Sequence, residues 1–335
     1  MNAPTKNPSL DLPTFADVED AAKRLAGKAV VTPLLEHPAL NETVGARVLL
    51  KCETFQVSGS FKFRGAYNRI SRLSDEEKAR GVVAYSSGNH AQGVAAAAKL
   101  VGTRALIVMP SDAPEVKVAG VRAFGGEVRS YDRWTESREA IGAEIARERG
   151  SVLVPPFDDR FVIAGQGTSG IELAHQARAM GAALDQVYCG ASGGGIVAGI
   201  GLAMEALSPQ TDMIVVEPAE YNDHALSLAA GARTKHAEAQ PSFCDALMAP
   251  MPGEVTFPIN GRLLKGALGV TDGEVAEAIR FAFRWLKLVV EPGGAVSLAA
   301  LLAGKADVKG KTVGVLLTGG NIDPGLFSRI LAGEI

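Results

Sequence analysis

Short apolar runs alternate along this chain with longer segments that are rich in alanine. Seven runs have the length and the valine, isoleucine and leucine content of buried strands: residues 46–51, 81–86, 105–110, 151–155, 186–190, 213–218 and 312–318. Helical patterns lie among them, at about 15–26, 62–73, 91–101, 115–124, 135–149, 163–180, 195–207, 273–287 and 294–303. Such alternation is typical of mostly parallel sheets flanked by helices, so we predict an α/β fold.

The length of the chain and one proline-broken segment predict two lobes. A chain of 335 residues exceeds the size at which a single core usually stops growing. The segment "VPPFDDRF" (154–161) can carry the chain back from one lobe to the other, which would interleave the lobes in sequence. Proline, glycine and methionine interrupt any periodicity over 218–262, and we expect this irregular region to border the site.

The charge balance argues against two classes of partner. There are 34 lysine and arginine residues against 37 aspartate and glutamate residues, so no basic face is expected for nucleic acid or an anionic membrane. No apolar stretch reaches the ~18 residues that span a bilayer. The start "MNAPTKNPSLDLP" lacks the apolar core of a signal peptide, and the three cysteines have no metal-type or redox-type spacing. We therefore expect a cytoplasmic protein with reduced thiols.

Four predicted strands are followed by unusual turns. The turns are "SSGNHAQG" (86–93), "GASGGGIVAG" (190–199), "EPAEYNDH" (217–224) and "TGGNID" (318–323). Ligands of open α/β sheets collect at the carboxyl ends of strands, and the glycine run would present successive N–H groups to an anion such as a phosphate. Each turn taken alone is equally compatible with close packing of a strand on a helix.

A lysine in an apolar setting adds to these turns. Lys62 lies in "SGSFKFRGA" (58–66), between two phenylalanines and among small residues that let a flat ligand approach the backbone. A solvated surface lysine is the competing interpretation. An amine, an anion cradle at a helix start and an apolar wall together fit pyridoxal phosphate, because its aldehyde, its phosphate and its ring need these three partners.

These motifs, in this order, resemble those of one family. Together with "VIAGQGT" (162–168) and "VEP" (216–218), they are similar to the tryptophan-synthase-like pyridoxal phosphate enzymes of fold type II. Within that family they resemble the branch of threonine/serine dehydratases, hydroxyaspartate dehydratases and serine racemases. The resemblance implies a large domain of residues 1–71 and 160–335, a small domain of residues 72–159, and a homodimer.

The resemblance also assigns roles to individual positions. Lys62 would form the Schiff base with the cofactor, Phe61 would pack against its ring, and Asn89 would bond its 3'-oxygen. Thr318 would place a hydroxyl on the pyridine nitrogen. Ser87 would help to hold the substrate carboxylate or, in a racemase, act as the acid/base on the second face. The phosphate cradle would be Ser192, Gly193, Gly194 and Gly195, and the substrate contacts would be Ser86, Ser87, Asn89, His90 and Arg138.

A cation site is implied by the same resemblance. Glu217, the carbonyl of Tyr221 and Asp223 match a divalent-cation site whose oxygen ligands suit Mg²⁺ or Ca²⁺. A plain pair of loop carboxylates is the competing interpretation. The other histidines have no spacing that suggests a metal, and we expect them to be incidental: His37, His175, His224 and His236.

The activity implied is that of an ammonia-lyase, which eliminates water from a small β-hydroxy amino acid and leaves a 2-oxo acid and ammonia. L-threonine and L-serine are the first expectation, because "PPFDD" (155–159) looks like threonine dehydratases. The segment "ESREA" (136–140) resembles serine racemases in placing an arginine, Arg138, at a position that can meet a dicarboxylic ligand, which would suit 3-hydroxyaspartate instead. A solvated position on a charged amphipathic helix is the competing interpretation of Arg138.

Two other functions stay open at this point. One is a serine racemase, in which Ser87 returns a proton to the opposite face of the substrate. The other is a non-catalytic sensor, which the presence of Lys62 and Asn89 disfavours because a binding module needs no imine-forming amine. The chain continues for 17 residues after Thr318 (335 minus 318), so we expect no C-terminal regulatory domain and no inhibition by isoleucine.

Overall fold

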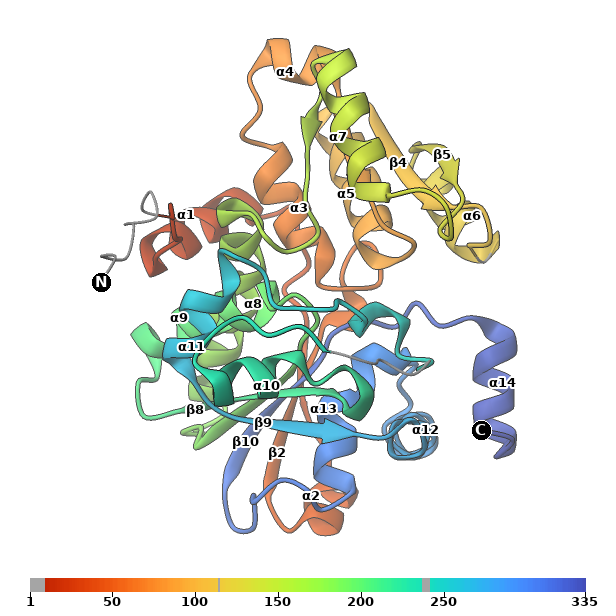
Figure 1. Cartoon of the computed structure of the whole chain (residues 1–335). Coiled ribbons are helices and arrows are strands. Elements are labelled where there is room, and N and C mark those ends of the chain that lie inside the picture. Colours follow the sequence, from red (N-terminus) through yellow and green to blue (C-terminus); the bar gives the residue numbers. More distant parts are fainter. Residues whose placement is uncertain (1–9, 114, 237–241) are drawn as a thin grey trace, which may run out of the picture.

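Two helix-flanked sheets, one in each lobe, form the framework of the molecule (Figure 1). The computed structural model describes residues 10–113, 115–236 and 242–335. The larger sheet has the strand order β1-β2-β10-β7-β8-β9, and the smaller sheet has the order β5-β4-β3-β6. Neighbouring strands are parallel except for β1 and β2. The predicted α/β class, with two lobes of mostly parallel sheet between helices, is therefore confirmed.

All seven predicted strands are present, and three more were not predicted. The strands of the larger sheet are β1 (Leu34–Glu36), β2 (Arg47–Cys52), β7 (Gln186–Gly190), β8 (Asp212–Pro218), β9 (Leu264–Val270) and β10 (Thr312–Leu317). Those of the smaller sheet are β3 (Val82–Tyr85), β4 (Ala105–Pro110), β5 (Glu127–Tyr131) and β6 (Val152–Leu153). The unpredicted strands, β1, β5 and β9, each lie at the edge of a sheet.

The nine predicted helices are present with ends shifted by a few residues: α1 (Phe15–Leu25), α3 (Lys62–Ile70), α5 (Asn89–Val101), α6 (Glu115–Ala123), α7 (Arg138–Arg149), α8 (Arg160–Ala179), α9 (Gly195–Leu207), α12 (Asp272–Phe281) and α13 (Pro292–Leu302). Five shorter helices complete the described chain: α2 (Pro38–Val44), α4 (Asp75–Arg80), α10 (Asp223–Ala230), α11 (Thr256–Leu263) and α14 (Pro324–Ala332). None of the described helices is long and apolar enough to cross a membrane.

The central strands of the larger sheet are buried on both faces. Along β2, Val48 and Leu50 pack into the cluster that contains helix α13, whereas Leu49 packs into the cluster of α8 and α9. This alternation is the two-residue period of a strand between two layers of helices. It explains the apolar run Val48–Leu50 in the middle of β2, which Arg47 and the buried Lys51 flank.

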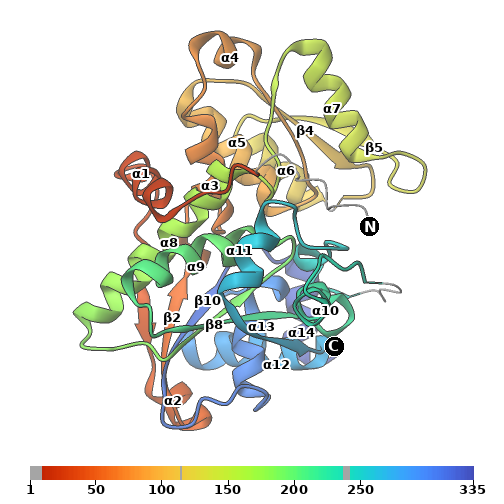
Figure 2. The same cartoon turned by 60° about the vertical axis from the view of Figure 1, so that its left-hand side comes forward.

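Helices α8 and α9 lie side by side because glycines face one another where they touch (Figure 1, Figure 2). A Cβ atom on Gly167 would come within 2.6 Å of the carbonyl oxygen of Gly199. No side chain fits at that distance, so the two backbones are in direct contact. The close approach fixes the position of helix α9, whose first residue is Gly195.

The region over 218–262 borders the site as expected, because residues 245–249 line the cavity described below, but it contains more regular structure than its sequence indicates. Helices α10 and α11 lie there, with one short 3₁₀ turn before α10 and one between the helices, while residues 237–241 lie outside the described part of the chain. Both helices have only eight residues, which is too short for a clear apolar period to stand out in the sequence. The predicted domain boundaries at 71/72 and 159/160 stay a prediction, although all strands of the smaller sheet lie between them.

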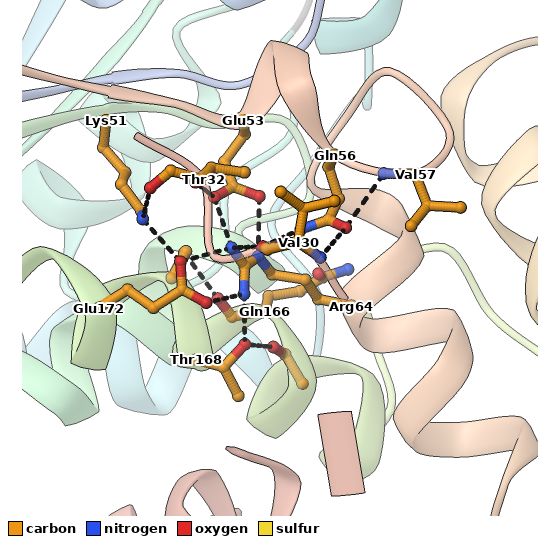
Figure 3. Close-up of polar contacts among 12 residues, drawn as sticks. Val30, Thr32, Lys51, Glu53, Gln56, Val57, Arg64, Gln166, Thr168 and Glu172 are labelled. Atoms are coloured by element: carbon orange, nitrogen blue, oxygen red, sulfur yellow. Dashed lines mark hydrogen bonds and ion pairs between the residues drawn. The ribbon is translucent and has the colours of Figure 1, made fainter. Parts of the chain in front are cut away.

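A buried cluster of four charged side chains, here called the ion cluster, ties the start of helix α3 to its neighbours (Figure 3). Arg64 on α3 makes paired hydrogen bonds of 2.7 and 2.8 Å to Glu53 and of 2.6 and 2.8 Å to Glu172 on α8. Lys51 on β2 donates to Glu172 at 2.6 Å and to the carbonyl of Thr32 at 2.7 Å. The cluster therefore joins a loop, the end of a strand and two helices.

Two positive and two negative groups make the ion cluster neutral overall, which is why it is tolerated in the interior. Arg64 is 1% exposed and Glu53 is not exposed at all. Burial by itself would raise the pKa of Glu53, but Arg64 outweighs it, so the pKa of Glu53 lies below its usual value. Both groups therefore stay charged at neutral pH, and removal of Arg64 would leave the buried carboxylate of Glu53 without its ion-pair partner.

Replacement of Arg64 tests how much the ion cluster contributes to the stability of the fold. Because Arg64→Met leaves two buried carboxylates without their main partner, we expect the free energy of unfolding to fall by about 3–5 kcal/mol. The midpoint of chemical denaturation measures the change. Arg329→Met is the control, since the Arg329–Glu334 pair has side chains that are 61% and 62% exposed. The two variants should differ clearly, and equal stability would show that the ion cluster does not hold the fold.

Candidate active site

A cavity of about 340 Å³ is lined by residues of both lobes. Every residue predicted to contact a cofactor or a substrate lies on its wall: Phe61, Lys62, Ser86, Ser87, Asn89, His90, Arg138, Ser192, Gly193, Gly194, Gly195 and Thr318. These residues come from segments that are far apart in the chain. They meet because parallel strands β3, β7 and β10 end on the side of the sheets where the cavity lies.

Lys62 is the first residue of helix α3 and presents its amine to the cavity. Its Nζ donates a hydrogen bond of 2.7 Å to the carbonyl of Pro156 and lies 5.1 Å from the centre of the Phe61 ring. Burial lowers the pKa of Lys62 to about 8, although the nearby carboxylate of Glu291 opposes the shift. About a tenth of this amine is therefore neutral and nucleophilic at pH 7, and about half at pH 8, far more than for an ordinary lysine with a pKa of 10.5.

Both the Nδ2 group and the Oδ1 atom of the Asn89 amide form hydrogen bonds with other side chains. The Nδ2 group donates to a carboxylate oxygen of Glu291, and the Oδ1 atom accepts from Nδ2 of Asn321 at 2.8 Å. Asn321 belongs to the "TGGNID" turn and also donates to the carbonyl of Ser58 at 2.8 Å. The amide of Asn89 is thus fixed in one orientation at the wall of the cavity.

Residues 192–195, here called the glycine cradle, turn between strand β7 and helix α9. Within the described part of the chain, no protein group accepts a hydrogen bond from the N–H groups of Gly193, Gly194 and Gly195. Gly194 has a φ of 91°, which only glycine adopts readily. Unpaired N–H groups at a helix start form a site for an anion such as a phosphate. The hydroxyl of Ser192 accepts the N–H of Ala249 at 3.1 Å.

The "PPFDD" segment supports both Lys62 and the glycine cradle. Pro156 accepts the hydrogen bond of the lysine amine, and the ring of Phe157 fills the space where a side chain on Gly193 would lie. Asp158 accepts the N–H groups of residues 254 and 255 at 2.8 and 2.7 Å, and Asp159 caps helix α8. This segment therefore shapes the amine and anion sites, and none of these contacts selects a substrate.

His90 is buried, and its ring donates from Nε2 to the carbonyl of Val154 at 2.8 Å. Burial, together with the positive charge of Lys62, lowers the pKa of His90 to about 3. The ring is therefore neutral at physiological pH and does not supply a proton. The neutral ring lies on the cavity wall in the orientation that this hydrogen bond fixes.

The model of one enzyme family, described as "Pyridoxal-phosphate dependent enzyme", matches residues 26–319. The chain belongs to this family. The prediction of a fold type II pyridoxal phosphate enzyme is confirmed, as is the predicted class of a pyridoxal-phosphate-dependent lyase. The matched range contains Lys62, the glycine cradle and Thr318, so all parts of the cavity described above belong to the shared region.

Two curated relatives and one solved structure are among the proteins to which this chain is similar. An L-threo-3-hydroxyaspartate ammonia-lyase of Pseudomonas sp. is 42% identical over 324 residues, which cover 97% of this chain and 100% of the relative. The enzyme of the same name from Saccharomyces cerevisiae is 40% identical, and the alignment covers 96% of this chain and 98% of the relative. The structure of maize serine racemase, at 35% identity, aligns with a TM-score of 0.88 over 96% of this chain and 98% of that one.

The cavity fits pyridoxal phosphate at each of its functional groups. The neutral amine of Lys62 suits the aldehyde, the free N–H groups of the glycine cradle suit the phosphate, and the Phe61 ring offers an apolar surface to the pyridine. Thr318, at the end of β10, is 5% exposed and offers a neutral hydroxyl. The assignment of each role to these residues stays a prediction.

A second polar group, here called the cation cluster, lies away from the cavity at the end of strand β8. It consists of Glu217, Asp223 and His224, all buried, and their ligand atoms lie within 4.8 Å of one another. Burial, and then the neighbouring Glu217, raise the pKa of Asp223 well above its usual range. The predicted ligands Glu217 and Asp223 are thus brought together, with Asp223 as the first residue of helix α10. Tyr221 lies on the same turn and is 8% exposed.

Several residues of the site were not found from the sequence. His224, which we expected to be incidental, contacts Glu217 from seven residues away. Glu291 lies outside every recognised turn, yet it orients Asn89 and faces Lys62. Lys117 and Arg133 also line the cavity, on segments whose charge pattern resembles that of any solvated helix or turn. Only the folded chain shows these four side chains to be close to the site.

The rate at which the chain without cofactor takes up pyridoxal phosphate reports the pKa of Lys62. Since only the neutral amine attacks an aldehyde, we expect the rate to rise with pH around a midpoint of about 8 and then to level off. In Glu291→Gln the midpoint should move to lower pH, because the carboxylate favours the charged amine. The growth of yellow absorbance measures the rate. A rate that rises steadily towards 10.5, the ordinary value for lysine, would contradict the account.

Proposed function

We propose that this enzyme is an ammonia-lyase that acts on L-threo-3-hydroxyaspartate, releasing water in the elimination and yielding oxaloacetate and ammonia after hydrolysis. The net change removes ammonia from the substrate, since the water that is lost is taken up again. The observation that carries the proposal is the placement of Arg138 on the wall of the cavity that contains Lys62. The names of the two curated relatives support the same substrate.

Pyridoxal phosphate, when bound, supplies an aldehyde that joins to amines and a ring that withdraws electrons from the α-carbon. The residues of the chain do the rest. The glycine cradle binds the phosphate, and Asn89, fixed by Glu291 and Asn321, orients the ring. The amine of Lys62, neutral near its pKa of about 8, can accept the proton of the α-carbon. Ser87, which faces the cavity, is placed to hold the α-carboxylate.

The small lobe supplies a guanidinium for a second carboxylate. Arg138, at the start of helix α7, lies over the ring of Tyr85 with its guanidinium 5.8 Å from the ring centre. Arg133 and Lys117 also line the cavity, where they pair with Asp112 and Asp245. A guanidinium binds a carboxylate with paired hydrogen bonds, so such a wall favours a dicarboxylic substrate over L-threonine or L-serine. The contacts of "PPFDD" support Lys62, the glycine cradle and neighbouring backbone, so they do not by themselves favour L-threonine over a dicarboxylic substrate.

One observation favours the second candidate, L-threonine or L-serine. Arg138 is bonded to Glu139 at 2.8 Å, and its side chain is 42% exposed. A substrate with one carboxylate would leave this ion pair undisturbed. The alternative of a serine racemase keeps Ser87 as its acid/base. A homodimer and Mg²⁺ stay predictions of the resemblance, and a cytoplasmic location stays a prediction from the sequence.

Measurement of 2-oxo acid release from L-threo-3-hydroxyaspartate, L-threonine and L-serine tests the substrate. We expect L-threo-3-hydroxyaspartate to have the highest kcat/KM. Loss of a charged hydrogen bond in Arg138→Ala should lower that value by about 10- to 100-fold, while kcat/KM for L-serine changes by less than about 3-fold.

Arg147→Ala is the matched control, because Arg147 is exposed on the same helix and does not line the cavity. It should leave all three values unchanged. If Arg138→Ala lowers turnover of all substrates equally, Arg138 does not select the second carboxylate. Higher turnover of L-threonine than of L-threo-3-hydroxyaspartate by the wild type would make the second candidate correct, and D-serine as the main product from L-serine would indicate a racemase.

A further inference from the structure

The cation cluster contains a buried carboxylate without a partner. Both oxygens of Asp223 are buried, and among the described residues neither has a hydrogen-bond partner. The Asp223 side chain is not exposed, and the carboxylate of Glu217 lies within the same cluster. Two buried carboxylates at such close range are costly unless a cation lies between them. The cluster therefore fits a divalent cation with oxygen ligands, as the sequence predicts.

His224 connects this cluster to helix α11. Glu217 accepts the backbone N–H of His224 at 2.9 Å, and its Oε1 atom lies 3.0 Å from the ring Nδ1. A carboxylate can only accept, so Nδ1 carries the proton and donates. In the neutral ring, Nε2 then has a lone pair, and Asn260 Nδ2 is placed to donate to it at 3.3 Å. Both side chains are almost completely buried, at 0% and 1% exposure.

Asn260 connects the same path to the glycine cradle. Its Nδ2 group also donates to the carbonyl of Gly194 at 3.2 Å. A side chain on Gly194 would come within 2.6 Å of His224 Nε2, so histidine and cradle are in direct contact. The carbonyl and the N–H of one trans peptide point in opposite directions. The carbonyl of Gly194 also accepts the N–H of Ala198 at 2.9 Å, so helix α9 and Asn260 together fix this peptide with the N–H of Gly195 turned towards the cavity.

We propose that His224 and Asn260 couple the cation cluster to the glycine cradle, so that a divalent cation bound at Glu217 and Asp223 strengthens the binding of the cofactor phosphate. A bound cation fixes Glu217, and through His224 and Asn260 it fixes the peptide whose N–H group meets the phosphate. The cluster lies outside the cavity wall, so the cation acts without touching the substrate. Because coupling is reciprocal, the phosphate strengthens cation binding by the same factor.

Binding measurements on the full chain without cofactor test the coupling. The Kd of pyridoxal phosphate is measured by absorbance with Mg²⁺, with Ca²⁺ and with a chelator. We expect at least one cation to lower this Kd by about 5-fold or more, which is the usual lower range for coupled sites. The Kd of that cation, from calorimetry, should fall by the same factor when pyridoxal phosphate is bound. Pyridoxal, which lacks the phosphate, should bind with the same Kd with and without the cation.

Two variants interrupt the path at different points. In His224→Asn the shorter amide can still donate to Glu217 but does not reach Asn260. In Asn260→Ala, His224 is kept, but its connection through Asn260 to the carbonyl of Gly194 is lost. Both should bind the cation and pyridoxal phosphate, with the coupling factor reduced to about one. His175→Asn, at an exposed histidine on helix α8, is the control and should keep the full factor.

The proposal fails if neither cation changes the Kd of pyridoxal phosphate in the wild type. It also fails if pyridoxal shows the same dependence on the cation, because the effect would then not pass through the phosphate. Retention of the full coupling factor in Asn260→Ala would show that the path does not carry it. Thermal unfolding of each variant confirms that a folded protein is compared, and Asn260→Ala serves as the decisive variant if His224→Asn does not fold.

Discussion

The paired hydrogen bonds of Arg64 to two buried carboxylates are the constraint on which the site depends. Arg64 and Lys62 are two residues apart at the start of one helix, so they face in different directions. The guanidinium points into the ion cluster (Figure 3), whereas Lys62 lines the cavity. A neutral cluster of fixed geometry thus anchors the helix end that carries the reactive amine. The position of the amine is fixed by contacts that a solvated lysine lacks.

Around this amine the same arrangement occurs several times: a polar turn follows the carboxyl end of a buried parallel strand. The turns after β3, β7 and β10 supply Asn89, the glycine cradle and Thr318. Two of these turns are held by further side chains, Asn89 by Glu291 and Asn321, and the carbonyl of Gly194 by Asn260. The cavity is therefore built before any ligand arrives, which lowers the entropy that binding costs.

The sequence predicted the central strands and the cavity-lining turns because their signals are local. A strand covered on both faces is mostly apolar, as in β7 and β10, and the glycine run before helix α9 stands out because it occurs in one pattern of motifs with Lys62 and with other polar turns that end strands. Edge strands β1, β5 and β9 were missed, since half-exposed residues and the glycines of β9 give no such run. Glu291 and His224 were missed for another reason. Their importance depends on partners brought close by the fold, which no spacing in the chain reveals.

Reduction of the holoenzyme with borohydride, followed by peptide mapping with mass spectrometry, tests the central claim most directly. Borohydride makes the link between pyridoxal phosphate and a lysine permanent, so the modified residue can be read from the peptide masses. We expect one pyridoxyl phosphate group per chain, on Lys62. Lys117 also lines the cavity and serves as the internal comparison. A label on Lys117, or no label on a yellow protein, would contradict the account.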